Sequence, residues 1–509
     1  MESLVSAIVS DLLSRALSMA IDKYYKGSNA QEAQDKVQRL ERVLLRINST
    51  IEAAEGRHIT NQAMLRMLEM LRQGMYEGHY MIDTVRYRRG LEGDDVVSGG
   101  AAVALSRLNS VKHLLSFRIN GNTKNTVLEA ESLKKLDKML GSLERMIGDT
   151  VEFVMFLEGY PRICRQPYDT HLILDKIMFC RQAEMETVIN FLLRPEITAG
   201  NGNPGVLPIV GAARVGKSTL VEHVCLDERV RGHFSSIVLF TGDDLGAGNF
   251  SALNVVSGVI KHRDITAQSS GTGKSLAIIE LSEDMEEETW RRLYTSASGS
   301  MGHGSKIIVT SRSDKIVAFG TVQALRLKVL TTEAYWYFFK ALAFGSTNPD
   351  DQPELASVGM EIAMLLKGVF TAANIVSRLL RDNLNTKFWR RVLWCLRDFS
   401  NRHLRMFGED PVDRIQKGKP VFIWMMARAQ HAVMLRNIYQ QDSSTQHVHG
   451  VPKLTAQDIL AGHATRQGKF TAVMWRSSIP PYYTYMVSCE SHTDEGSTIS
   501  KKRPREDRI

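Results

Sequence analysis

Apolar residues recur at helical spacing along the first 155 positions of the chain. Three stripes, at residues 4–21, 37–51 and 64–75, advance in steps of three and four. Such steps place apolar side chains on one face of an α-helix, and that face must be buried. The pattern therefore predicts an N-terminal helical domain of the coiled-coil type over residues 1–155.

The longest apolar stripe closes this domain. It consists of Leu133, Leu136, Leu140, Leu143, Ile147, Val151 and Val154. Alternating steps of three and four form a heptad-like seam, which suits either the core of a helical bundle or pairing with another helix. The sequence leaves both alternatives open. If the seam pairs between chains, charged residues at Leu140 and Leu143 should abolish pairing more than folding.

Short apolar runs alternate with helical segments in the middle of the chain. A helix is expected over Asp175–Leu193, after a break at residues 161–167. The apolar runs follow at residues 205–210, 237–240, 276–279, 306–310 and 325–329. Runs that are apolar on both faces and separated by helices are typical of a doubly wound, mostly parallel α/β sheet. This domain is predicted over residues 165–330.

Helical patterns return in a small domain predicted over residues 331–405, whose aromatic segment 333–339 is expected to be packed core. Residues 406–490 carry a weaker signal and are expected to be a degenerate or truncated region, with a loop at residues 440–446. The polar, basic residues 491–509 are expected to be a disordered tail. The predicted fold class is therefore multidomain, combining α and α/β parts.

Composition changes this picture little. The formal net charge of +8 is modest for 509 residues, and since the sequence assigns it to no single face, there is no clear nucleic-acid site. The five cysteines are scattered without CxxC spacing, which favours a reducing compartment. No apolar run approaches the roughly 20 residues that a membrane span needs. We expect a cytoplasmic protein, with nuclear targeting by the basic tail as the alternative.

The segment Gly211-Ala-Ala-Arg-Val-Gly-Lys-Ser218 carries the clearest chemistry. It fits the pattern of a phosphate-binding loop, and an apolar run precedes it while a helical pattern follows. In that setting backbone N–H groups and a helix N-terminus point at a polyphosphate. Lys217 would neutralise the phosphates, and the Ser218 hydroxyl would bind Mg²⁺. Ala213 and Arg214 stand where richer versions of this loop carry glycine.

Two further residues lie at predicted strand ends, where α/β sheets bind ligands. Glu280 ends the third strand and is the candidate partner of Ser218 for Mg²⁺, but Leu281 follows it where an efficient hydrolase has a second acid. Arg312 ends the fourth strand and could bind a γ phosphate. The predicted nucleotide-binding residues are Gly211, Arg214, Val215, Gly216, Lys217, Ser218, Thr219 and Arg312, with ADP or ATP and Mg²⁺ as cofactors.

These pieces, in this order, resemble plant intracellular immune receptors of the coiled-coil NB-ARC type over roughly residues 1–400. The phosphate loop matches the first motif of that family, and Gly304-Ser-Lys-Ile-Ile-Val-Thr-Ser-Arg312 matches its strand-and-arginine motif. Residues 76–83 resemble the acidic motif of the N-terminal bundle, although His79-Tyr80 replaces the acidic pair. Gly368-Val-Phe-Thr-Ala372 stands where the family has Gly-Leu-Pro-Leu-Ala. We find neither a Met-His-Asp motif nor leucine-rich repeats.

The resemblance implies a signalling protein of plant innate immunity that binds ADP or ATP and acts as a nucleotide-dependent switch or truncated receptor. Its N-terminal helices would contact other immune proteins or a second copy of the chain. The alternative is an adaptor or decoy whose nucleotide site has decayed. The residues favour at most a weak ATPase, because the paired acids of an efficient hydrolase are missing.

Overall fold

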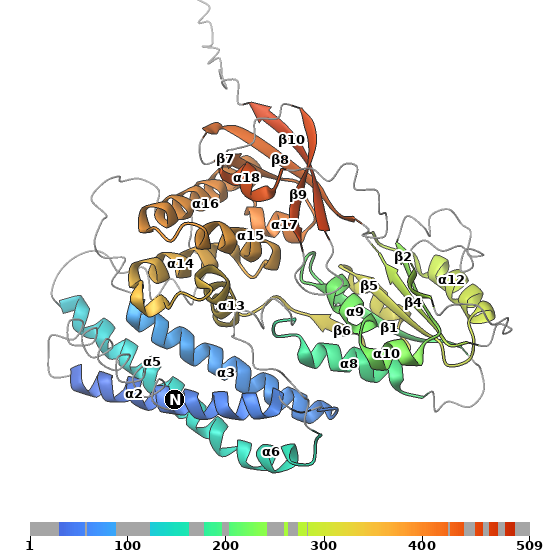
Figure 1. Cartoon of the computed structure of the whole chain (residues 1–509), viewed down its shortest axis with the longest axis horizontal. Coiled ribbons are helices and arrows are strands. Elements are labelled where there is room, and N and C mark those ends of the chain that lie inside the picture. The colour runs from blue at the N-terminus through green and yellow to red at the C-terminus, as the bar shows by residue number, and fades with distance from the viewer. Residues whose placement is uncertain are drawn as a thin grey trace, which may run out of the picture. The chain divides into compact units, whose positions relative to one another are not determined.

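The computed structural model describes residues 30–55, 57, 59–87, 123–161, 178–195, 203–241, 259–262, 273–281, 283–425, 428–441, 454–461, 468–476 and 484–493. The chain forms two compact units (Figure 1). Unit 1 comprises Met1–Pro167 and Ser346–Met360, and unit 2 comprises Tyr168–Gly345 and Glu361–Ile509. The predicted stripe at residues 4–21 and most of the predicted basic tail lie outside the described residues.

Unit 1 is built on helices, as its apolar stripes predict. These are α2 (Ala30–Glu55), α3 (Gln62–Tyr87), α5 (Thr123–Gly148) and α6 (Thr150–Leu157). The second and third stripes are buried between α2, α3 and α5, with Leu40, Ile47 and Leu68 at most 1% exposed. Two glycines allow this close packing, because a Cβ at Gly78 would lie 2.5 Å from a methyl carbon of Leu44. Likewise, a Cβ at Gly74 would lie 2.9 Å from a methyl carbon of Leu143.

The heptad-like seam is mainly a core stripe. Leu136, Leu140 and Leu143 are buried within the bundle, whereas Val151 and Val154 are exposed on α6. This agrees with the first of the two alternatives for the seam. A charge at Leu140 or Leu143 would be a buried charge, so it would disturb the fold of the bundle itself rather than pairing alone.

A network of polar groups joins the end of α3 to the 3-10 helix η4 (Pro349–Asp351). Arg86 donates from one nitrogen to both carboxylate oxygens of Asp350 at 3.1 Å and from another to Glu41 at 2.9 Å. The hydroxyl of Tyr87 donates to Asp350 at 2.6 Å. Burial, followed by the carboxylates of Asp83 and Asp350, raises the pKa of Tyr87, which therefore remains a donor. The four groups satisfy one another although their elements are far apart in sequence.

A six-stranded sheet forms the centre of the α/β part of unit 2. Its strands are β1 (Gly205–Gly211), β2 (Ser236–Thr241), β3 (Val259–His262), β4 (Ser275–Glu280), β5 (Lys306–Ser311) and β6 (Leu325–Leu327), in the order β3-β2-β4-β5-β1-β6. All neighbours are parallel except β2 and β3. The sequence predicts five of these strands; the antiparallel edge strand β3 was not predicted. Pro208 is tolerated in β1 because β6 pairs only from Ile209 onward, which leaves Pro208 with a strand on one side.

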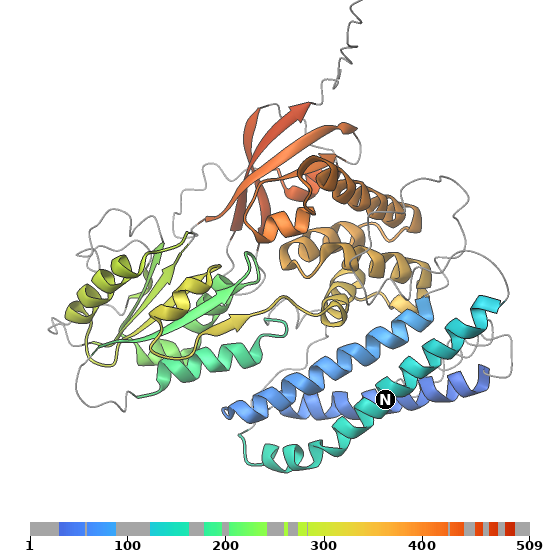
Figure 2. The same cartoon turned by 180° about the vertical axis from the view of Figure 1, so that it is seen from behind.

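Helices cover both faces of this sheet, which confirms the predicted doubly wound arrangement (Figure 2). The helices α8 (Gln182–Leu193), α9 (Lys217–Cys225) and α10 (Glu228–His233) cover one face, while α12 (Glu287–Ser300) and the 3-10 helix η3 (Asp314–Phe319) cover the other. Helix α8 begins later than the predicted Asp175. Cys180 has φ +54° and Arg181 is its non-helical N-cap, so the helical backbone cannot extend through them.

Five α-helices lie between β6 and residue 420. These are α13 (Thr332–Phe344), α14 (Pro353–Leu366), α15 (Phe370–Arg381), α16 (Thr386–Phe407) and α17 (Pro411–Gln416). The aromatic segment of α13 is packed core, as predicted, with Trp336 and Phe339 at most 2% exposed. No helix in the described part of the chain is both long and apolar enough to cross a membrane.

The region after residue 420 holds an antiparallel sheet that the sequence analysis did not predict. Its strands are β7 (Val421–Met425), β8 (Arg428–Gln441), β9 (Lys469–Arg476) and β10 (Thr484–Thr493), in the order β7-β8-β10-β9, and α18 (Ala456–Ala461) packs on it. The expected loop at residues 440–446 begins inside β8, and its other residues lie outside the described ones. Buried His403 joins α16 to this sheet by accepting a hydrogen bond from the backbone N–H of Phe422 at 3.1 Å.

Candidate functional site

The segment from residue 211 to 218 forms the predicted turn between a buried strand and a helix. Strand β1 ends at Gly211, and α9 begins at Lys217. Gly211 must be glycine because a Cβ there would lie 2.8 Å from the carbonyl oxygen of Leu327. Gly216 has φ +96°, a backbone conformation that glycine adopts without strain. Buried Val215 anchors the turn in the core, so the loop is a fixed structure.

Lys217 lies across this turn. Its ammonium group donates to the carbonyl oxygens of Gly211 at 2.8 Å and Ala212 at 2.9 Å. Burial lowers its pKa to about 8, although the nearby carboxylate of Glu280 acts in the opposite direction. A half-buried ammonium group held by the loop's own carbonyls can exchange those partners for an anion, since an anion is the stronger acceptor.

Arg214 occupies the tip of the loop in a strained conformation. Its φ is +62°, which costs a non-glycine residue about 1–3 kcal/mol. This is one of the positions at which the sequence lacks an expected glycine. Burial lowers the pKa of Arg214 to about 10. No residue in the described part of the chain hydrogen-bonds to its guanidinium or forms an ion pair with it, so the loop holds a second cation that an anionic ligand could satisfy.

Ser218 and Glu280 are brought together, as the sequence analysis expects of a metal-binding pair. Glu280 at the end of β4 accepts a hydrogen bond from the Ser218 hydroxyl. Burial raises the pKa of Glu280, while the bond from Ser218 and the charge of Lys217 lower it. The Oε1 atom of Glu280 is buried without a hydrogen-bond partner. An orphaned carboxylate oxygen beside a hydroxyl is a donor set that fits Mg²⁺.

Leu281 belongs to the hydrophobic core rather than to the site. Its side chain is 7% exposed and packs in the cluster beneath α12. Its backbone N–H donates to Thr310 at 2.9 Å, which continues the pairing of β4 with β5. The second acid of an efficient hydrolase is therefore missing, and its sequence position faces inward.

Arg312 directly follows β5, the strand next to β1 in the sheet. Its guanidinium is exposed, and its charge helps to lower the pKa of Lys217. One nitrogen donates to the backbone carbonyl of Lys417 at 2.7 Å. In this conformation the predicted phosphate sensor is thus bound to the turn that follows α17.

Two residues that the sequence did not predict for this site, Tyr485 and Met178, lie close to the turn between β1 and α9. Tyr485 of β10 shares a hydrogen bond with Thr219, the second residue of α9 after Lys217, and burial raises the pKa of Tyr485 to about 12. The terminal carbon of Met178 would lie 4.0 Å from a Cβ at Gly216. No local signal marks either residue, because each reaches the loop from a distant part of the chain.

The segment Gly368–Ala372 lacks the proline of the Gly-Leu-Pro-Leu-Ala motif, but it retains the glycine of that motif. Gly368 has φ +82°, and it separates α14 from α15. The hydroxyl of buried Tyr335 donates to the carbonyl of Val369 at 2.9 Å and fixes this turn against α13.

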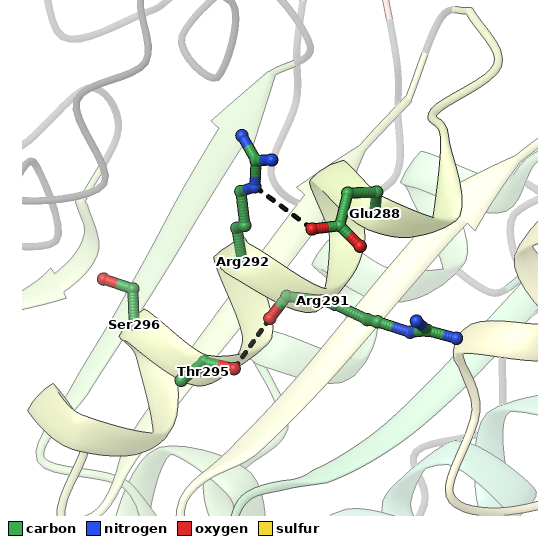
Figure 3. A pocket seen from close by; sticks show the side chains of 5 residues that line it. All are labelled: Glu288, Arg291, Arg292, Thr295 and Ser296. Atoms are coloured by element: carbon green, nitrogen blue, oxygen red, sulfur yellow. Dashed lines mark hydrogen bonds and ion pairs between the residues drawn. The ribbon is translucent and has the colours of Figure 1, made fainter.

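A hollow of about 470 Å³ lies on the outer surface of α12, away from the loop. Figure 3 shows that its labelled side chains all come from this one helix. Glu288 pairs with Arg292 at 3.3 Å, and the hydroxyl of Thr295 donates to the carbonyl of Arg291. These are ordinary contacts of an exposed helix surface, so we assign no site to it.

Comparison with known proteins shows which proteins the chain is similar to. Residues 8–116 match the family model of the Rx N-terminal domain. The chain is 23% identical over 418 residues to the disease resistance RPP13-like protein 1 of Arabidopsis thaliana, and 21% over 371 residues to disease resistance protein RGA2 of Solanum bulbocastanum. The chain is a homologue of plant disease resistance proteins. The matches cover 77% and 70% of it but only 37% and 36% of these relatives.

The homology therefore extends over most of this chain, while the chain spans little more than a third of the length of these relatives. Among solved structures, a chain in a structure of Drosophila ORC bound to DNA aligns with 46% of this homologue at 12% identity. That alignment covers 69% of the ORC chain, and its TM-score of 0.30 is too low to support any argument.

Proposed function

We propose that the chain binds ADP or ATP with Mg²⁺ at the turn between β1 and α9, and that this binding controls a signalling role in plant defence. The observation that carries the proposal is that Lys217 and Arg214, two half-buried cations of this loop, form no ion pair with a carboxylate in the described part of the chain. Two partly dehydrated cations in a turn rich in backbone N–H groups favour the binding of a polyphosphate, because its oxygens accept hydrogen bonds from both kinds of donor.

Ser218 and Glu280 would hold the metal ion, since they supply a hydroxyl and an orphaned carboxylate oxygen. Bound Mg²⁺ would neutralise phosphate charge. Arg312 would leave the Lys417 carbonyl for a terminal phosphate oxygen, because a charged acceptor binds a guanidinium more strongly than a neutral one. The N-terminal bundle would contact other immune proteins or a second copy of the chain, and α6 offers exposed Val154, Met155 and Phe156 for this.

The deciding experiment identifies the nucleotide that the protein retains. We expect acid extraction of the purified protein to release ADP or ATP in near-stoichiometric amount. Calorimetry of the emptied protein should then show Mg²⁺-dependent binding. No retained nucleotide and no heat of binding would contradict the proposal. That result would favour the alternative of an adaptor or decoy with a decayed site, which the strained backbone of Arg214 supports.

Hydrolysis should be slow even when nucleotide is bound. Glu280 has no acidic neighbour at the next position, since Leu281 is in the core, so no second carboxylate holds the attacking water. We expect turnover well below the lower end of the roughly 1–100 s⁻¹ range of kinases. Phosphate release under saturating MgATP measures this. Turnover within that range that is lost in Glu280→Ala would contradict the prediction.

Nucleotide affinity should fall at alkaline pH. Burial lowers the pKa of Lys217 to about 8 in the free protein, whereas a bound polyphosphate would favour the ammonium form and raise this pKa. Binding therefore takes up a proton above about pH 8, and the association constant should fall by up to about tenfold per pH unit. Calorimetry between pH 7 and 9.5 would measure this; an affinity that is constant over the range would contradict it.

A further inference from the structure

The side chain of His403 lies at the junction between α16 and the C-terminal sheet. It is completely buried, with 0% of its surface exposed. The indole ring of Trp424 on β7 meets it edge-on, with the ring centroids 5.3 Å apart, and the ring of Phe407 lies at 5.7 Å. Histidine changes its charge close to neutral pH, so the protonation state of this enclosed imidazole bears on how α16 and β7 are joined.

The partners of the two ring nitrogens fix the neutral form of His403. Nδ1 lies 2.8 Å from the backbone carbonyl oxygen of Phe399, which can only accept, so Nδ1 carries a proton. Nε2 lies 3.1 Å from the backbone nitrogen of Phe422, whose N–H can only donate, so Nε2 carries none. Both hydrogen bonds exist together only in this tautomer. A second proton, on Nε2, would place two N–H groups against each other and remove the bond to β7.

The charged groups of α17 do not favour a second proton on this ring. Asp410, the N-cap of α17, is the nearby acid, but it already accepts from the Ser400 hydroxyl at 2.7 Å and pairs with Lys367 at 3.1 Å. The guanidinium of Arg414 lies over the ring of Phe407, 3.9 Å from its centroid, and repels positive charge. An imidazolium would therefore face a cation and an acid whose charge is shared with other groups.

The other elements at this junction do not change that balance. Helix α16 places Arg402 over the ring of Trp424 at 5.0 Å, and Arg402 pairs with Asp398 at 2.7 Å. Strand β7 contains no ionisable side chain. Burial is the main cause that lowers the pKa of His403, and Arg414 adds to it, although the bond to the helix carbonyl and the α17 N-cap carboxylate act in the opposite direction.

We propose that His403 is a pH-sensitive switch that holds the start of β7 against α16. While the imidazole is neutral, it accepts the hydrogen bond from Phe422. When Nε2 takes up a proton, Phe422 loses this acceptor and the start of β7 separates from the helix. Strand β7 suits such a separation, because it has only five residues and lies at an edge of its sheet. The switch requires no nucleotide, so it is independent of the function proposed above.

Opening of β7 also affects the turn that precedes it. Residues 417–420 join α17 to β7, and the carbonyl of Lys417 accepts the hydrogen bond from Arg312 at 2.7 Å. Gly418 has φ +71°, and a Cβ there would collide with a guanidinium nitrogen of Arg312, so the turn fits closely around that side chain. When the start of β7 opens, this turn loses its fixed end and holds Arg312 less firmly.

Acid should open the start of β7. In the open state His403 takes up a proton below about pH 6.5, the ordinary pKa of histidine, whereas in the closed state it does so only at a lower pH. Between these two pKa values the open population should rise as the pH falls, by up to about tenfold per pH unit. Above about pH 6.5 both states are neutral, so the pH should have no effect through this group.

Hydrogen exchange of β7 in the full chain, corrected for intrinsic rates between about pH 7.5 and 4.5, tests the proposal. Wild-type protection should be constant down to about pH 6.5 and then fall. His403→Gln should remove this fall, because its amide oxygen can accept from Phe422 and does not titrate. The matched control is His303→Gln, which removes an exposed imidazole and should keep the fall. Constant wild-type protection, or an equal fall in His403→Gln, would overturn the proposal.

Nuclear magnetic resonance of the imidazole nitrogens provides a second test, which holds even if His403→Gln does not fold. At pH 7 the wild-type ring should carry its proton on Nδ1, with Nε2 bare, and it should titrate with a pKa below about 6.5. A ring protonated on Nε2 would overturn the proposal, because it could not accept from Phe422. A pKa at or above about 6.5 would do the same, because closure would then not oppose the proton.

Discussion

Replacing Lys217 by alanine should weaken the binding of ADP or ATP about 30- to 150-fold. The change removes a half-buried ammonium group that would form charge-assisted hydrogen bonds with phosphate, and such bonds contribute about 2–3 kcal/mol. The loop itself should remain folded, because Gly211 and Val215 fix its backbone independently of the lysine side chain. Calorimetry of both proteins, emptied of nucleotide, measures the difference.

Lys138→Ala is the matched control for this experiment. Lys138 is an exposed lysine on α5, so its loss changes the net charge equally without touching the loop. We expect wild-type affinity in this variant. Equal binding by wild type and Lys217→Ala would show that nucleotide does not use this loop. Thermal melting of the emptied proteins should show closely similar transitions, which separates a lost contact from a lost fold.

Replacing Asp350 by alanine should destabilise unit 1 by about 2–3 kcal/mol. Asp350 accepts three hydrogen bonds, two from Arg86 and one from Tyr87, and both donors would lose this partner. Breaking a buried ion pair from one side costs about 3–5 kcal/mol. We expect less because the Arg86 and Asp350 side chains keep 17% and 19% of their exposure.

Hydrogen exchange of α3 and denaturant unfolding measure this loss. Asp351→Ala is the control, because Asp351 is the exposed neighbour in η4 and removes the same charge from the same turn. We expect a change within about 0.5 kcal/mol for that variant, as for most surface substitutions. A loss of equal size in both variants would assign the effect to the turn rather than to the network.

The turn between β1 and α9 and the central sheet could be predicted because their signals are local. Glycine and lysine spacing sets the turn, and apolar runs of five or six residues set the buried strands. The pairing of Ser218 with Glu280 follows from the same logic, since parallel strands end at one edge of a sheet.

Contacts between distant segments could not be predicted. Nothing near Asp350 marks it as the partner of Arg86, and nothing near Tyr485 marks it as the partner of Thr219. The C-terminal sheet was missed for a different reason. Its register shifts between Val487 and Cys489 and again between Tyr485 and Met486, so buried positions do not alternate regularly along its strands. Alternation is the sequence signal by which half-buried strands are recognised.

The position of η4 in unit 1 bears on how the chain can be divided into fragments. A fragment that ends near residue 155 or 167 contains Arg86 and Tyr87 but not Asp350, and it would therefore expose a guanidinium and a phenol that the whole chain keeps satisfied. If such a fragment aggregates or self-associates, the cause could be the groups exposed by the cut, and not only a property of the native bundle. Supplying Ser346–Met360 as a second peptide, with Asp350 or with alanine in its place, would separate these two causes.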